Sequence, residues 1–186
     1  MENIRYREDF DLVNDIAPGK HFYQFYKSPG DLLQIIVPYF EAGVRKNNFC
    51  FWALPPFLTV EKAKEALARS IPNIDDLIQM GNFEIVTKLE WYGNGETFDG
   101  NFVLKKYVNK IKEAISRGFS IIRLTGDMSD TKSDLWPTVQ EYEQKVQSQM
   151  DLLPCIVLCS YSIHELHLQQ TKEVLDCHHS VLIAKV

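Results

Sequence analysis

The sequence predicts an α/β fold in three layers, with a mostly parallel sheet between two layers of helices. The continuous apolar run at 49–54 is typical of a strand that is buried on both faces, and 120–125 is expected to be another buried strand. Segments with apolar residues at helical spacing alternate with such runs, and short turns rich in glycine or proline separate them. This alternation predicts βαβ units and therefore a parallel sheet.

Six segments have the patterns of strands. Residues 20–26 are aromatic and 83–87 alternate between apolar and polar side chains, as strands often do. The run at 49–54 ends at Pro55-Pro56, and the run at 120–125 is followed by Gly126. The six expected strands span 20–26, 49–54, 83–87, 120–125, 154–160 and 180–185.

Helices are expected between the strands. Thr59 can cap one helix, and Ser162 with Glu165 has the pattern of a capping box for the last one. Pro38 lies inside the first helix and is expected to kink it, because proline removes one backbone hydrogen bond. The expected helices span 31–46, a segment after Thr59, 73–80, 101–117, 134–149 and 163–177, whereas 88–100 reads as a glycine-rich aromatic loop.

Length and composition limit the classes of protein. The 186 residues are enough for one domain, expected at 20–186 after a lead-in segment at 1–19. A formal net charge of −5 argues against direct binding to nucleic acid or to anionic membranes. No apolar run approaches the roughly 20 residues of a membrane span, and the N-terminus does not resemble a signal peptide. We therefore expect a cytoplasmic protein with four reduced cysteines.

The turn after the first strand has the place of a phosphate loop but not its chemistry. A phosphate loop needs glycines followed by Gly-Lys-Ser/Thr, so that backbone N–H groups and a lysine reach the phosphates. Here Lys27 and Ser28 precede the single glycine, Gly30, and Asp31 follows it. A carboxylate is unfavourable where phosphates bind. The sequence predicts a scaffold of nucleotide binders that now senses another compound.

Several stretches, in this order and spacing, carry a resemblance to a known family. They are HFYQFY at 21–26, VPYFEAGVRKNNFCFWAL at 37–54, EWYGNGETFD at 90–99, RGFSIIRLTGDM at 117–128, EYEQKV at 141–146 and LPCIVLCSY at 153–161. Together they resemble the MEDS domain, the methanogen/methylotroph sensory domain first described in the regulator of dichloromethane use. The resemblance extends from about residue 20 to the C-terminus.

The resemblance implies a RecA/KaiC-like fold with a degenerate phosphate loop and a role in sensing small hydrocarbon derivatives, such as methylated or halogenated one-carbon compounds. Members of the family are usually joined to DNA-binding or kinase modules. This chain has room for neither, so we expect a separate signalling partner, a kinase or a transcription regulator.

Two candidate ligand contacts are expected near the first strand. His21 is either a hydrogen-bonded structural histidine or a ligand or switch residue, since imidazole titrates near neutral pH. Cys159, beside Tyr161, is closer to the carboxyl end of its strand than Cys155. In a RecA-like strand order this strand neighbours the first one, so Cys159 is expected to approach Phe25 and Lys27; a purely structural thiol is the alternative.

A metal site is not expected. Cys155 and Cys159 are four strand residues apart, about 13 Å, and cannot share one ion. His164 and His167 are expected on one helix face, but Cys177 follows about 20 Å further along an unbroken helix. His178 resembles a family position and is expected to be a structural contact; His179 follows it directly.

Two acids have the positions of catalytic or metal-binding groups. Asp127 follows Leu-Thr-Gly at a strand end, where a Walker-B acid would bind Mg²⁺, yet without a phosphate-loop Lys-Ser this metal has no nucleotide to bridge. The alternative is that Asp127 caps the turn. Glu143 matches the Tyr-Glu pair of the family and is a candidate second acid.

Aromatic residues complete the candidate site. Trp52 lies on a buried strand and is a core residue or a ligand contact. Trp91 and Tyr92 lie in the expected glycine-flanked loop, where they could cover a pocket or form an interaction surface. A tryptophan ring suits a quaternary ammonium group, and Glu90 would complement its charge.

We therefore expect a non-catalytic sensory domain without a cofactor, as a monomer or a homodimer, which binds a small ligand at the carboxyl ends of the strands. The first alternative is an interaction module without a ligand. The second is a KaiC-like ATPase, which the missing Gly-Lys-Ser/Thr disfavours.

Overall fold

The computed structural model describes residues 16–93, 96–129, 131–178 and 180–182. Its centre is a parallel sheet of six strands in the order β3-β2-β4-β5-β1-β6. The strands are β1 (Lys20–Tyr26), β2 (Phe49–Ala53), β3 (Phe83–Val86), β4 (Ile122–Asp127), β5 (Cys155–Ser162) and β6 (Ser180–Val181). The prediction of an α/β fold with a parallel sheet is confirmed.

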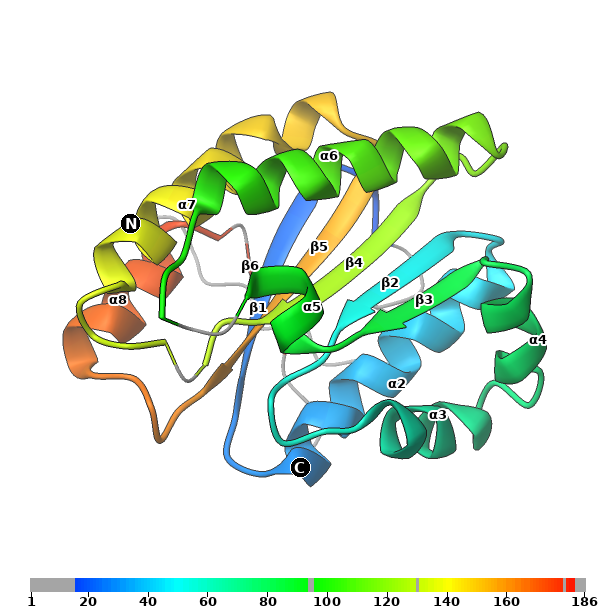
Figure 1. Ribbon diagram of the computed structural model, residues 1–186, viewed down its shortest axis with the longest axis horizontal. Coiled ribbons are helices and arrows are strands. Elements are labelled where there is room, and N and C mark those ends of the chain that lie inside the picture. Colours follow the sequence, from blue (N-terminus) through cyan, green and yellow to red (C-terminus); the bar gives the residue numbers. More distant parts are fainter. Residues whose placement is uncertain (1–15, 94–95, 130, 179, 183–186) are drawn as a thin grey trace.

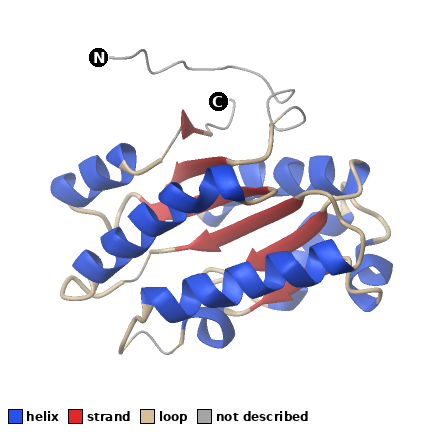
Figure 2. Cartoon of the chain, turned by 90° about the horizontal axis from the view of Figure 1, so that it is seen from above, coloured by secondary structure: helices blue, strands red, loops and turns tan. Residues whose placement is uncertain are grey.

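Helices cover both faces of this sheet (Figures 1 and 2). One face carries α6 (Gly100–Ser116) and α7 (Trp136–Gln149), and the other carries α2 (Pro29–Arg45), α3 (Val60–Ala68) and α4 (Ile74–Gln79). The remaining helices are α5 (Lys88–Tyr92), the 3₁₀ turn η1 (Met150–Leu152) and α8 (Leu168–Asp176). None of the described helices is long and apolar enough to cross a membrane.

The hydrophobic core is divided by the sheet into two clusters. Alternate residues of each strand point to opposite faces, so Phe51 packs below α6 whereas Trp52 packs against the α2 side. All residues of β2 and β4 are buried, because helices lie above and below these strands. The strand expected at 49–54 thus has its predicted role, and the one expected at 120–125 is buried as predicted but begins two residues later, at Ile122.

Most helix ends follow the capping signals of the sequence. Ser28 caps α2 and Thr59 caps α3, each through its side-chain oxygen. α2 is a single helix from Pro29 to Arg45 that contains Pro38. Asp99 accepts the N–H of Phe102 at 3.0 Å and caps α6.

Two expectations about local structure are wrong. Residues 88–92 are a helix rather than part of a loop, since Thr87 and Glu90 form a capping box. The last helix begins at Leu168 instead of residue 163. Ser162 belongs to β5, where it pairs with Tyr26 and donates its N–H to Ser129, so it cannot cap a helix.

The boundary expected at residue 20 coincides with the start of β1. Most of the lead-in segment lies outside the described residues, as do His179 and residues 183–186 of the expected last strand.

Candidate functional site

The turn after β1 is closed by the side chain of Asp31. Its Oδ2 accepts the backbone N–H groups of Lys27 and Ser28, each at 3.1 Å. The next residue, Pro29, has no N–H to offer. The hydrogen bond from Lys27 contributes most to lowering the pKa of Asp31. This carboxylate therefore uses the N–H groups that a bound phosphate would need.

Asp127 is also held by protein groups. It ends β4 in a buried position, where Tyr26 donates its hydroxyl to Oδ2 at 2.8 Å and Ser129 donates its N–H to Oδ1 at 2.9 Å. Burial raises the pKa of Asp127 to about 6, while the nearby charge of Lys88 acts in the opposite direction. The bond to Ser129 gives Asp127 the turn-capping role that was one of its two expected roles.

A pocket opens beside Asp127 at the carboxyl edge of the sheet. We call it the carboxyl-edge pocket; its lining includes Lys88, Tyr92, Phe98, Asp127, Met128 and Leu135. Its unfilled space is about 360 Å³ when the open mouth is included, but only about 30 Å³ of it admits the centre of a water-sized molecule, so the pocket is small. Its walls combine aromatic and aliphatic surface with one ammonium and one carboxyl group.

A second pocket, the interhelical pocket, lies between α6, α7 and the sheet. Its lining is almost entirely apolar and includes Leu104, Tyr107, Val108, Tyr142, Val146 and Val157. The two pockets share no lining residue, so substitutions can close them separately.

Trp91 is a core residue, which corrects the expectation of an exposed aromatic lid. Only 8% of it is exposed, and its ring packs 4.4 Å from Phe51 and 4.8 Å from Tyr107. The ammonium group of Lys106 lies 4.3 Å from the Trp91 ring, where a ligand cation would have to bind. Glu90 is exposed and caps α5.

Tyr92, the neighbour of Trp91, is half-buried, lines the carboxyl-edge pocket and shares a hydrogen bond of 2.8 Å with Tyr107.

Three further predicted residues lie apart from this pocket. Trp52 is 1% exposed and packs against Phe40 on the opposite face of the sheet, so its core role holds. Lys27 is exposed, and its described contact is the backbone bond to Asp31. Phe25 is half-buried, 6.3 Å from the ring of Tyr161.

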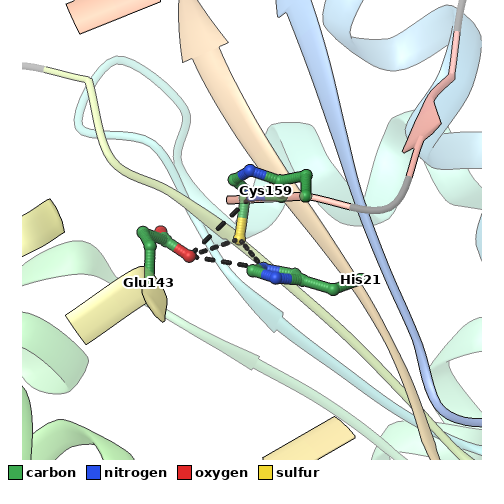
Figure 3. A group of neighbouring side chains, drawn as sticks. His21, Glu143 and Cys159 are labelled. Atoms are coloured by element: carbon green, nitrogen blue, oxygen red, sulfur yellow. Dashed lines mark hydrogen bonds and ion pairs between the residues drawn. The ribbon is translucent and has the colours of Figure 1, made fainter. Parts of the chain in front are cut away.

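Four side chains of the α7 face meet in what we call the buried cluster: His21, Glu143, Cys159 and His178. Figure 3 shows three of them pointing toward one another from β1, α7 and β5. His21 Nε2 lies 3.2 Å from Cys159 Sγ and 3.3 Å from Glu143 Oε2. Cys159 therefore meets His21 rather than Phe25 or Lys27, although β5 neighbours β1 as expected.

Electrostatics in the buried cluster favour a carboxylate beside a protonated thiol. Burial alone would raise the pKa of Glu143, but hydrogen bonding and charge from His21 and charge from His178 hold it below its ordinary value. Burial, and next the charge of Glu143, raises the pKa of Cys159. Tyr161 donates its hydroxyl to Glu143 Oε1 at 3.0 Å. The pKa of Glu143 is thus lowered, whereas that of Asp127 is raised.

A family model identifies the family to which the chain belongs. The model of the methanogen/methylotroph, DcmR sensory domain, MEDS, matches residues 20–179. The chain belongs to the MEDS family. This match confirms the resemblance seen in the sequence, and with it a sensory role.

Solved structures support the fold of this MEDS domain. The flagellar accessory protein FlaH from Methanocaldococcus jannaschii is similar with a TM-score of 0.60 at 13% sequence identity, over 96% of this chain and 77% of that chain. At this identity the likeness concerns the fold alone. A comparison with curated proteins found no match.

The MEDS match contains all four residues of the buried cluster. In the sequence, His21, Glu143 and Cys159 are separate candidates and His178 is expected to be a structural contact. His164 and His167 do not belong to the last helix, which begins only at Leu168. These four residues come together through the pairing of β1 with β5 and the packing of helices on the sheet. The spacing of residues along the chain shows neither contact.

Proposed function

We propose that this MEDS domain is a non-catalytic sensor that binds a small ligand in the carboxyl-edge pocket and signals to a partner protein. One observation carries the proposal. Asp31 accepts the N–H groups of the first βα turn, and Tyr26 donates a hydrogen bond to Asp127. The groups that a phosphate and its metal would need are therefore bonded within the protein, while the carboxyl edge of the sheet still has a pocket.

The lining of the pocket supports a small compound with an apolar part and one polar or cationic group. Phe98, Met128 and Leu135 supply apolar surface, and Lys88 and Asp127, which are already bonded to Ser129 and Tyr26, give the lining charges of both signs. Ligands of open α/β sheets bind at this edge, and a conformational change here would move α5 and the start of α7. Methylated amines and halogenated one-carbon compounds are the classes to test first.

Thermal unfolding of the full chain tests the proposal with a panel of methylamine, trimethylamine, tetramethylammonium, dichloromethane and methanol. A ligand that binds the native state raises the melting temperature; at a concentration of 100 Kd the stabilisation is about 2.7 kcal/mol. We expect at least one compound to raise it.

Two blocking variants locate the site. Leu135→Trp fills the carboxyl-edge pocket and is expected to abolish the shift, whereas Val108→Trp fills the interhelical pocket and is expected to preserve it. If the shift in melting temperature is lost only in Val108→Trp, the ligand binds in the interhelical pocket instead. A panel without any shift would favour a ligand-free interaction module instead.

A further inference from the structure

The buried cluster has nearly the dimensions of a metal site, since its wider pairs, up to 4.8 Å, need to close by only about 1 Å around an ion. Its four potential ligand atoms lie within 4.8 Å of one another. A tetrahedral zinc ion with bonds of about 2.0–2.3 Å holds its ligand atoms roughly 3.3–3.8 Å apart. Glu143 Oε2 lies 3.3 Å from His21 Nε2, 3.6 Å from Cys159 Sγ and 3.8 Å from His178 Nε2.

The outer partners of the two histidines orient these ligand atoms inward. His178 Nδ1 lies 2.7 Å from the carbonyl oxygen of Val174, which can only accept, so Nδ1 carries the proton and Nε2 faces Glu143. His21 Nδ1 lies 3.2 Å from Gln147 Oε1 in the same manner. A ligating histidine commonly donates its other ring N–H to a carbonyl oxygen in this way.

The charges also match a divalent ion. Two neutral imidazoles, one carboxylate and one thiolate carry a total charge of −2, which a divalent cation neutralises. The His21 and His178 side chains are fully buried, and that of Glu143 nearly so. Burying the negative charges of a carboxylate and a thiolate is unfavourable unless a positive charge lies beside them. A divalent cation would supply that positive charge.

We propose that His21, Glu143, Cys159 and His178 together bind one divalent transition-metal ion of the zinc class. Thiolate and imidazole donors favour such an ion over Mg²⁺ or Ca²⁺, which prefer oxygen donors. On binding, the Cys159 S–H bond breaks, its proton leaves to solvent, and the thiolate sulfur forms the bond to the metal.

Such an ion would join parts of the fold that are far apart in the sequence. Its ligands come from β1, α7, β5 and the connection between α8 and β6. Four protein ligands fill a tetrahedral site, which is typical of structural rather than catalytic zinc. None of the four lines the carboxyl-edge pocket, so metal binding and ligand binding can be measured independently.

Cobalt(II) is the probe that tests this assignment. The full chain is reduced, stripped with a chelator and titrated with CoCl₂ alone. We expect about one equivalent to bind, with the sulfur-to-cobalt charge-transfer band and the d–d bands of a tetrahedral site. We also expect a higher melting temperature in the presence of zinc, because a metal that binds the native state stabilises it.

Variants with a matched control assign the ligands. Cys159→Ala is expected to abolish the charge-transfer band, whereas Cys155→Ala, a buried thiol on the same face of the same strand, keeps it. His178→Gln is expected to weaken cobalt binding by tenfold or more, since loss even of an outer partner commonly has this effect.

The wild-type chain alone can overturn the proposal. A folded chain that shows no charge-transfer band with cobalt has a hydrogen-bonded cluster and no metal site. A band that survives in folded Cys159→Ala also contradicts the assignment. Should that variant not fold, X-ray absorption of the zinc-loaded wild type decides: one sulfur with three nitrogen or oxygen donors supports the site, and a shell without sulfur refutes it.

Discussion

Ser28 and Asp31 hold each other across the first βα turn. The Ser28 N–H donates to the Asp31 carboxylate at 3.1 Å, and the Asp31 N–H donates to the Ser28 hydroxyl at 3.2 Å. This reciprocal pair is a capping box for α2. It occupies the place where a phosphate loop would present its N–H groups, and so one pair of residues both starts the helix and closes the turn.

Removing either half of this capping box is expected to destabilise the chain. Ser28→Ala should lower the free energy of unfolding by about 1 kcal/mol, a usual value for loss of an N-cap side chain. Asp31→Ala should lower it as well. Because the two bonds depend on each other, urea denaturation should show less loss in the double variant than the sum of the single losses. Strict additivity would mean that the two bonds act separately.

Asp127 is expected to make stability depend on pH. Its folded pKa of about 6 is raised above the ordinary value of 3.8, so between these values the folded state binds the proton more strongly than the unfolded state. Stability from this group is therefore highest below about pH 4 and is lost as the pH rises through 6. Each unit of pKa difference corresponds to about 1.4 kcal/mol, which gives about 3 kcal/mol in total.

The Asp127→Asn variant isolates this effect. Other carboxyl groups contribute equally to both proteins, so the free energy of unfolding of Asp127→Asn relative to wild type should rise by about 2 kcal/mol from pH 4 to pH 7. Urea denaturation at four or more pH values measures it. A difference that stays constant over this range would show that the pKa of Asp127 is not raised.

Gly126 allows α5 to dock on the end of β4. A Cβ added at this position would overlap the Tyr92 hydroxyl oxygen and lie 3.2 Å from the Tyr107 hydroxyl. We expect Gly126→Ala to lower the free energy of unfolding by about 1–3 kcal/mol, as overpacking does. Tyr92→Phe in the same chain should recover part of the loss. Gly30→Ala is the control, because its nearest neighbour would be 3.5 Å away.

Trp91 is expected to act through the core. Trp91→Ala should lower the free energy of unfolding by about 3–5 kcal/mol, since it removes a buried aromatic side chain. Leu89→Ala, in the same helix but 65% exposed, should stay within about 0.5 kcal/mol of wild type. Guanidinium denaturation compares the two variants, and equal small effects would mean that the Trp91 ring is not packed as described.

The layered fold could be predicted from local patterns because each buried strand carries its own signal, as residues 49–54 do. The degenerate turn could also be predicted, since Asp31 follows Gly30 directly in the chain. The buried cluster could not, because Glu143 and Cys159 meet only after α7 packs on β5. Their place depends on contacts between distant segments, and no spacing rule describes these.

The last helix begins later than its local pattern predicts, for a related reason. Ser162 has a local capping pattern, yet pairing with Tyr26 extends β5 through this residue. Tertiary pairing outweighed the local preference there, whereas the helix that carries Trp91 follows from a local signal, the capping box of Thr87 and Glu90.

Calorimetric titration of the wild-type chain with Mg-ATP tests the central claim most directly. The claim is that the first βα turn, filled by Asp31, no longer binds a nucleotide. The account predicts no heat of binding. Binding of Mg-ATP in the micromolar range that disappears in Asp127→Ala would contradict it, because a nucleotide would then occupy the turn with its metal at Asp127.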